Sequence, residues 1–125
     1  MISAITFTGY SSPLKTNWRN GNLPTVKKGF YGDVLTQDNL SLEHLRPHSK
    51  GGKTDLANLV LASKSKNRER SNKDINEFIN MKTVREYLSQ FTNVRIKGFN
   101  GNNYIDMILR TLKKLGVNTQ KKTTT

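Results

Sequence analysis

The sequence predicts an α+β fold in which an antiparallel pair of strands is followed by several helices. Residues 40–45 alternate apolar and polar side chains as a half-buried strand does, and the adjacent Gly51 and Gly52 mark a loop after them. A second apolar run covers residues 56–62, and beyond it apolar residues recur with helical spacing. These observations predict a two-stranded hairpin, a helix behind it and further helices toward the C-terminus.

The first 30 residues carry few signals of regular structure. They contain three glycines and two prolines among scattered apolar positions, so we expect irregular structure with a short strand at residues 2–7. Trp18 is predicted to anchor this segment against the core. Because Lys15 and Arg19 flank the indole, stacking on a nucleic-acid base is the alternative. Residues 30–33 are expected to form a turn.

The helix after the hairpin is expected to begin near Lys64. A hydroxyl of Ser63 or of Ser65 can accept hydrogen bonds from the unpaired amides of a first helical turn. Asn67 then lies in the first turns of this helix. The polar residues 72–74 then interrupt the helical pattern.

Three more helices are expected downstream. Apolar residues at i, i+3 and i+4 define a short helix over residues 75–79. Thr83 and Glu86 have the spacing of a capping box, which opens the next helix. The last helix covers residues 103–115, with an apolar face of leucines and isoleucines, and Gly116 is its natural stop.

The length of 125 residues fits one small domain. We expect a hairpin-and-helix core over residues 30–80, a helical extension over 81–116 and a disordered tail over 117–125, because residues after 117 offer nothing apolar to bury. Residues 91–97 favour neither helix nor strand. The segment before residue 30 is the irregular basic part of the same domain.

The net charge of +12, from 21 basic and 9 acidic residues, favours a polyanionic partner, nucleic acid before membrane lipid. No apolar run approaches the roughly 20 residues that span a bilayer, and the N-terminus lacks the blocks of a signal peptide, so a soluble cytoplasmic protein is expected. The absence of cysteine excludes disulfides and cysteine-ligated zinc. Most basic residues are expected to be solvated surface groups, and the remainder to contact phosphates on either side of a central catalytic segment.

Three polar residues in the predicted hairpin and helix combine the groups that phosphodiester hydrolysis needs. A histidine with an ordinary pKa of about 6.5 is well matched to deprotonating water near neutral pH, so His44 is the candidate general base. A carboxylate and an amide oxygen suit Mg²⁺ or Mn²⁺, so Glu43 and Asn67 are the candidate metal ligands. Glu43 and His44 are adjacent and would point to opposite faces of a regular strand, so we expect a distorted strand end, which Pro47 and the glycine loop permit.

The run from Ser41 to Leu61, with Glu43–His44, Pro47, the double glycine and Asn58, together with Asn67 further on, resembles the HNH endonuclease family. The resemblance covers about residues 30–80 and implies the ββα-metal fold of that family. The three positions of the family pattern fall on His44, Asn58 and Asn67, the variant that ends in asparagine rather than histidine. The resemblance implies a single divalent ion, not a zinc-only site.

Further residues are candidates for supporting roles. Asn58 is expected to bond loop backbone and so hold His44 in place, with metal ligation as the alternative. His48 is expected to be an ordinary exposed residue, with a contact to metal-bound water or DNA as the alternative. Arg70 is the favoured phosphate clamp, although any basic helix residue could equally be solvated. The full set of candidate phosphate contacts is Lys50, Lys53, Lys66, Arg68 and Arg70.

These features predict a metal-dependent endonuclease that nicks DNA and leaves a 3′ hydroxyl, as the family does. One such site cuts one strand, so double-strand cleavage requires a homodimer, a partner protein or two sequential nicks. A phage or mobile-element setting follows by analogy only. The alternative is a non-catalytic, basic nucleic-acid-binding module on the same scaffold, and RNA is a further candidate substrate.

Overall fold

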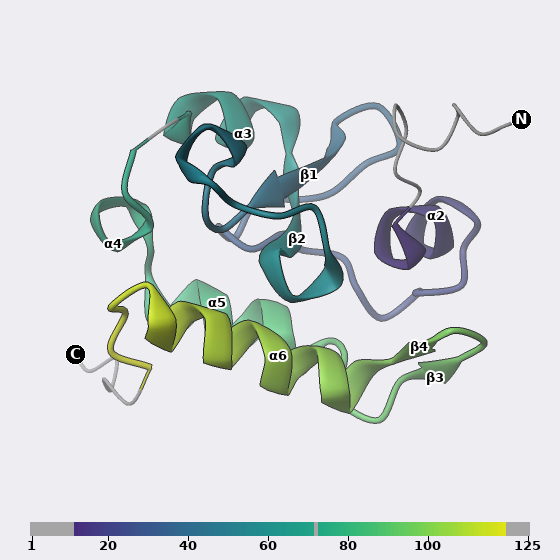
Figure 1. The fold of residues 1–125 in the computed structure, drawn as a ribbon. Helices are drawn as coiled ribbons and strands as arrows, with labels where there is room; N and C mark the ends of the chain where they lie inside the picture. The colour runs from purple at the N-terminus through teal and green to yellow at the C-terminus, as the bar shows by residue number, and fades with distance from the viewer. Residues whose placement is uncertain (1–11, 72, 120–125) are drawn as a thin grey trace, which may run out of the picture.

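The computed structural model describes residues 12–71 and 73–119 and has the predicted α+β architecture (Figure 1). Two separate two-stranded antiparallel sheets are present in this part of the chain, β1 with β2 and β3 with β4. The elements in chain order are α2 (Pro13–Arg19), β1 (Leu40–His44), the 3₁₀ turns η1 (His48–Lys50) and η2 (Leu56–Asn58), β2 (Leu59–Ser63), α3 (Lys64–Arg70), α4 (Ile75–Phe78), α5 (Met81–Ser89), β3 (Arg95–Ile96), β4 (Phe99–Asn100) and α6 (Gly101–Lys114).

The β1–β2 hairpin forms as predicted, with His44 at the end of β1 opposite Leu59. The second strand begins at residue 59 and not at 56, because Asp55 accepts a hydrogen bond from the Ala57 amide and caps the 3₁₀ turn η2. The connecting loop needs its second glycine, because a Cβ at Gly52 would overlap the Arg46 carbonyl oxygen. The loop therefore folds back tightly against the end of β1.

Strand β2 is buried along its whole length, since helices cover it on both sides. Helix α3 follows β2 directly and packs against both strands, and Ser63 is its N-cap, accepting from the Lys66 amide at 3.2 Å. Helices α5 and α6 lie together along the other side of the hairpin (Figure 1). Of the two capping serines considered from sequence, Ser63 is the one used.

A buried relay of hydroxyl groups ties α5 and α6 to β2. The Leu61 amide donates to the Tyr87 hydroxyl at 3.0 Å, and the Tyr104 hydroxyl donates to the Leu59 carbonyl at 2.7 Å. The two hydroxyls are 2.8 Å apart, so Tyr87 must donate to Tyr104. Both rings are completely buried, and the relay leaves no hydroxyl unpaired in the core.

The prediction of irregular structure before residue 30 is wrong for residues 13–19, which form α2. Ser12 accepts from the Leu14 amide at 3.0 Å and Pro13 occupies the first turn, a strong local start signal. Leu14 is fully buried, and the Trp18 indole packs against the core and donates to the Val26 carbonyl at 2.7 Å. The packing role of Trp18 is thus confirmed. The strand expected at residues 2–7 lies outside the described residues.

The C-terminal half differs from expectation at helix ends. Asn80, not Thr83, caps α5, and the Thr83 hydroxyl lies 2.9 Å from the Asn80 carbonyl and 3.2 Å from the Phe30 carbonyl. The ambiguous residues 91–97 contribute to the short β3–β4 hairpin, whose Asn100 caps α6. Gly116, with φ of +88°, ends that helix as predicted.

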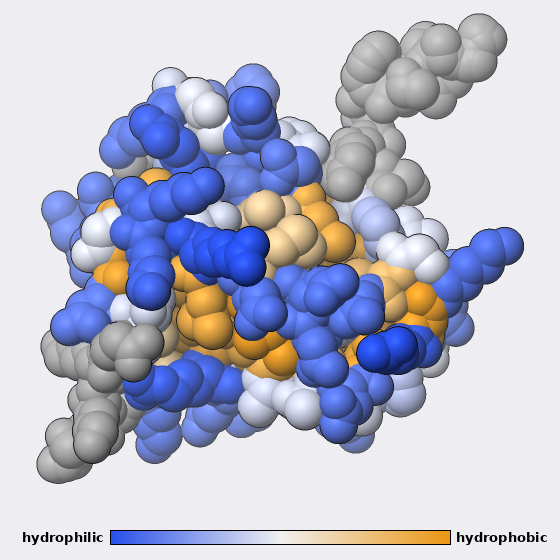
Figure 2. Space-filling view, turned by 60° about the horizontal axis from the view of Figure 1, so that its bottom comes forward, coloured by the Kyte–Doolittle hydropathy of each residue, from blue (hydrophilic) through white to orange (hydrophobic). Residues whose placement is uncertain are grey.

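The tail predicted to be disordered from residue 117 is packed at its first position, since Val117 is 6% exposed. Residues 120–125 lie outside the described part. Hydrophilic side chains cover much of the face around α6, and hydrophobic residues show between them (Figure 2). No helix in residues 12–71 and 73–119 is both long and apolar enough to cross a membrane.

Candidate active site

An open pocket of about 390 Å³ lies where β1 ends and the chain turns into η1. Strand β1 contributes Glu43 and His44, and α3 contributes Asn67. The three residues singled out in the sequence therefore line one cavity, although 22 residues lie between His44 and Asn67. The complete lining is Glu43, His44, Pro47, His48, Ser49, Asn67 and Ser71.

The side-chain amide of Asn67 is oriented by β1. Its Nδ2 donates to Ser41 Oγ at 2.9 Å and to the Leu42 carbonyl at 3.1 Å, which uses both amide protons. The opposite end of the amide, Oδ1, accepts no hydrogen bond from a described residue. The oxygen is thus left available on a residue that lines the pocket.

Glu43 is 4% exposed and is held by two partners from outside β1. The Tyr31 hydroxyl donates to its Oε2 at 2.6 Å, and the Arg70 guanidinium lies 3.3 Å from the same oxygen. Burial raises the pKa of the Glu43 carboxyl, while Tyr31 and Arg70 lower it in part. The same burial, together with the Glu43 charge, raises the pKa of the Tyr31 phenol, so Tyr31 remains a donor.

Arg70 has a different environment from the one predicted. Its side chain is 1% exposed, and it donates from Nε to the Lys73 carbonyl and from Nη1 and Nη2 to the carbonyls of His44 and Leu45, at 2.7 to 2.8 Å. Each guanidinium nitrogen thus donates to a backbone carbonyl inside the protein. The role of phosphate clamp is therefore corrected: Arg70 fixes the end of β1 and balances the charge of Glu43.

His44 is half-buried beside the pocket, and its Nε2 lies 3.0 Å from the Thr54 hydroxyl in the glycine loop. The His48 ring is 6.2 Å away, centre to centre, in an edge-on arrangement. Burial lowers the pKa of His44, and the charges of His48 and Arg70 lower it further. The imidazole is accordingly neutral near pH 7, the form that can accept a proton.

Asn58 bonds the loop that follows His44. Its Oδ1 accepts from the Arg46 amide at 2.8 Å, and its Nδ2 donates to the carbonyls of Arg46 and Lys53 at 3.1 and 2.8 Å. It does not line the pocket that contains His44. These contacts are those of a residue that holds the loop, the role expected for it.

The remaining basic candidates are at the surface. Lys66 pairs with Glu69 at 3.3 Å, which takes up part of its charge, whereas Arg68 is exposed next to Asn67. Lys50 and Lys53 are exposed in the loop between the strands. Of these four, none lines the pocket of His44, so any phosphate contact by them lies outside it.

Two residues beside the site were not anticipated, Tyr31 and Thr54. Tyr31 precedes Glu43 by 12 residues in a segment without periodicity, so no local pattern indicates that its hydroxyl reaches Glu43. Thr54 lies in the loop, and its position opposite His44 depends on how the glycines fold that loop back.

The donor set can be tested against the divalent ion that the sequence implies. Residues 12–71 and 73–119 contain no group of three or more histidine, aspartate or glutamate side chains arranged to hold a metal. A carboxylate and an oriented amide oxygen in one pocket are nevertheless hard donors of the kind that Mg²⁺ prefers, with water completing the shell. Glu43 and Asn67 thus fit a weakly held Mg²⁺ or Mn²⁺.

The antiparallel hairpin and the helix packed on it form a ββα unit, and Glu43, His44 and Asn67 line one pocket of it. A family model described as HNH endonuclease matches residues 31–74. The match covers about a third of the chain and agrees with the resemblance noted from the sequence. No match to the chain was found among curated proteins.

Proposed function

We propose that the protein is a metal-dependent endonuclease that hydrolyses DNA phosphodiester bonds one strand at a time. The observation that carries the proposal is the meeting of Glu43, His44 and Asn67 in one pocket inside the segment of the HNH family. The charge of +12 suits a substrate made of linked phosphates. The choice of DNA over RNA follows the resemblance to the family.

His44 is the general base of the proposed reaction. A neutral imidazole at the mouth of an open pocket can take a proton from a water molecule that attacks the phosphorus atom. The Thr54 hydroxyl, 3.0 Å from Nε2, can restrain the ring. Because burial lowers the pKa of His44, the base is available from mildly acidic pH upward.

Glu43 and Asn67 would hold the divalent ion, Mg²⁺ or Mn²⁺. When bound, such an ion stabilises the charge that develops on the nonbridging and leaving oxygens of the phosphate. Tyr31 and Arg70 act as positioning residues, since both contact Glu43 and hold its carboxylate at the edge of the pocket. The positive charge of Arg70 weakens the affinity of this site for a cation, so binding without DNA is expected to be weak.

The test is the nicking of supercoiled plasmid in Mg²⁺ or Mn²⁺ by the wild type, His44→Ala and His48→Ala. Loss of a general base is expected to reduce the rate by about 10²- to 10⁴-fold. His48 lines the same pocket and provides the matched control, expected to keep a rate close to that of the wild type. Equal nicking by His44→Ala and wild type contradicts the assignment of His44, and DNA binding by the wild type without any nicking favours the non-catalytic module.

A further inference from the structure

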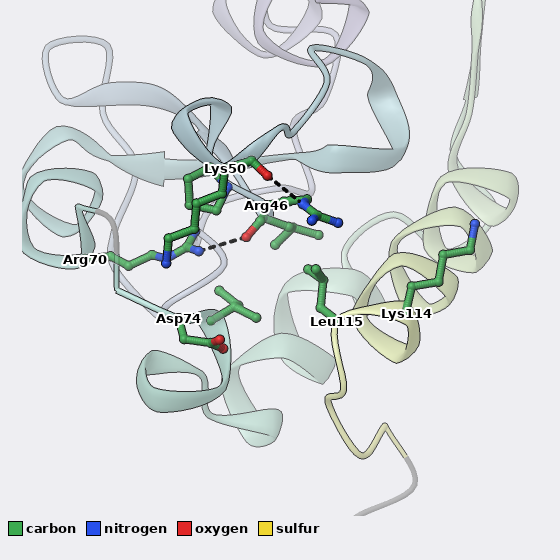
Figure 3. Close-up of a pocket in the computed structure, with 9 residues that line it drawn as sticks. Arg46, Lys50, Arg70, Asp74, Lys114 and Leu115 are labelled. Atoms are coloured by element: carbon green, nitrogen blue, oxygen red, sulfur yellow. Dashed lines mark hydrogen bonds between the residues drawn. The ribbon is translucent and has the colours of Figure 1, made fainter.

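A second pocket, of about 280 Å³, is lined in part by the loop that carries η1 (Figure 3). Pro47 lines this pocket and also the pocket of His44, so one short loop separates the two. Figure 3 shows three walls: Arg46 and Lys50 from the loop, Arg70 and Asp74 from the region between α3 and α4, and Lys114 and Leu115 from the end of α6. Helix α6 lies outside the segment that matches the family.

Hydrogen bonds from the backbone and from the side chain position Arg46 at this pocket. Its backbone amide and carbonyl both bond to the side chain of Asn58, and its Nε donates to the Lys50 carbonyl at 2.9 Å. The terminal nitrogens of the guanidinium, in contrast, have no hydrogen-bond or acidic partner in the described parts of the chain. A guanidinium whose Nε is already hydrogen-bonded loses little conformational entropy when its terminal nitrogens bind an anion in a bidentate manner.

The charges around the pocket leave an excess of positive charge. Arg70 is balanced by Glu43, and the carboxylate of Asp74 lies close enough to Lys50 for that charge to contribute to its lowered pKa, after the larger effect of the bonds from Asn76. Lys114 is exposed and forms no ion pair within residues 12–71 and 73–119. Among the residues that line the pocket, Arg46 and Lys114 therefore have no acidic partner in the described parts of the chain.

The end of α6 does not cancel this positive charge. Helix C-termini repel anions through their unpaired carbonyl groups. Here the carbonyls of Thr111, Leu112 and Lys113 accept hydrogen bonds from the amides of residues 115–117, and the Leu115 carbonyl accepts from Asn76 Nδ2 at 2.8 Å. Lys114 thus lines the pocket from a helix end at which the carbonyls of residues 111–113 and 115 are paired.

We propose that this second pocket binds a phosphate of the nucleic-acid backbone that flanks the bond cut at His44, with Arg46 and Lys114 as its principal contacts. The inference rests on the proposed function, because it takes the same nucleic acid to occupy both pockets. A polymer with regularly spaced phosphates suits two adjacent sites on either side of Pro47. The pocket positions the polymer and takes no part in the chemical step.

The experiment measures the affinity for a fluorescein-labelled 20-base-pair DNA duplex as a function of salt, with EDTA present so that cleavage does not occur. The variants are Lys114→Gln and Arg46→Gln/Lys114→Gln. Lys113→Gln is the matched control, since Lys113 is the preceding exposed residue of α6 and does not line the pocket. Thermal unfolding confirms that each variant is folded.

Each lost phosphate contact lowers the slope of log K against log salt by about 0.9. We expect a slope shallower by about 0.9 for Lys114→Gln and by about 1.8 for the double variant, with Lys113→Gln close to the wild type. Equal changes in Lys113→Gln and Lys114→Gln, or no change in the double variant, overturn the proposal. The salt slopes test phosphate binding by the pocket without any cleavage. Failure of the wild type to nick plasmid would instead contradict the nuclease proposal and leave the result on phosphate binding unchanged.

Discussion

Replacement of Arg70 by methionine separates a role inside the protein from a role in binding phosphate. The change leaves the buried Glu43 carboxylate without its cation and removes donors from three backbone carbonyls. Removal of one partner of a buried ion pair costs about 3 to 5 kcal/mol. At about 4 °C per kcal/mol for a chain of this length, the melting temperature is expected to fall by roughly 12 to 20 °C.

The assay is chemical denaturation followed by circular dichroism, with Arg68→Met as the matched control. Arg68 lies on the same helix but is exposed, so its replacement is expected to change the free energy of unfolding by less than about 0.5 kcal/mol. Adding Glu43→Gln to Arg70→Met removes the orphaned charge and is expected to recover about 1 kcal/mol or more. An Arg70→Met protein as stable as Arg68→Met, but weaker in binding DNA, would refute this reasoning.

Three further predictions concern the loop, the metal site and the core. Asn58→Ala removes three hydrogen bonds to loop backbone and is expected to lower the free energy of unfolding, measured in urea, by about 2 to 4 kcal/mol. A loss below about 0.5 kcal/mol would contradict the loop-holding role. Tyr31→Phe removes the hydroxyl that donates to Glu43, and it is expected to raise the Mg²⁺ concentration for half-maximal nicking about 10-fold. DNA binding in EDTA is expected to stay unchanged. An unchanged Mg²⁺ requirement would count against positioning of Glu43 by Tyr31. Burial raises the pKa of Tyr87 and of Tyr104, so both phenols lose their protons at lower pH in the unfolded chain than in the folded protein. The free energy of unfolding is therefore expected to fall above pH 10 by about 1.4 kcal/mol per pH unit for each group. Tyr104→Phe should flatten this decline in thermal melts, and an equally steep decline in that variant would contradict the assignment.

The parts of the site that adjoin the hairpin could be predicted because they depend on local structure. Glu43 and His44 end a strand, the glycines turn the chain, and Asn67 lies on the helix that follows the second strand. A hairpin with a helix directly after it brings these positions together whatever the remainder of the chain does. Strands β1 and β2 could be predicted for the same reason, except that the 3₁₀ turn η2 replaces the expected start of β2.

The error at Arg70 has a geometric cause. Asn67 and Arg70 are three residues apart and share a face of α3, so a helix that turns Asn67 toward β1 turns Arg70 the same way. The exposed Arg68 lies on another face. The sequence pattern alone treated these basic residues as equivalent, whereas the phase of the helix distinguishes them.

Elements that depend on distant contacts could not be predicted. The β3–β4 hairpin has two residues in each strand, too few for a periodic signal. The contact of Tyr31 with Glu43 requires the segment before β1 to fold across the hairpin. The start of α5 was also missed, because Asn80 caps the helix by accepting from the Lys82 amide, which places Thr83 inside the first turn.

The most direct test of the proposed site is anomalous diffraction from crystals of the His44→Ala protein bound to a short DNA duplex and Mn²⁺. One Mn²⁺ peak is expected at about 2.0 to 2.3 Å from an oxygen of Glu43 and from Oδ1 of Asn67, with a DNA phosphate beside it. A peak distant from both oxygens, or DNA that leaves this pocket empty, would contradict it.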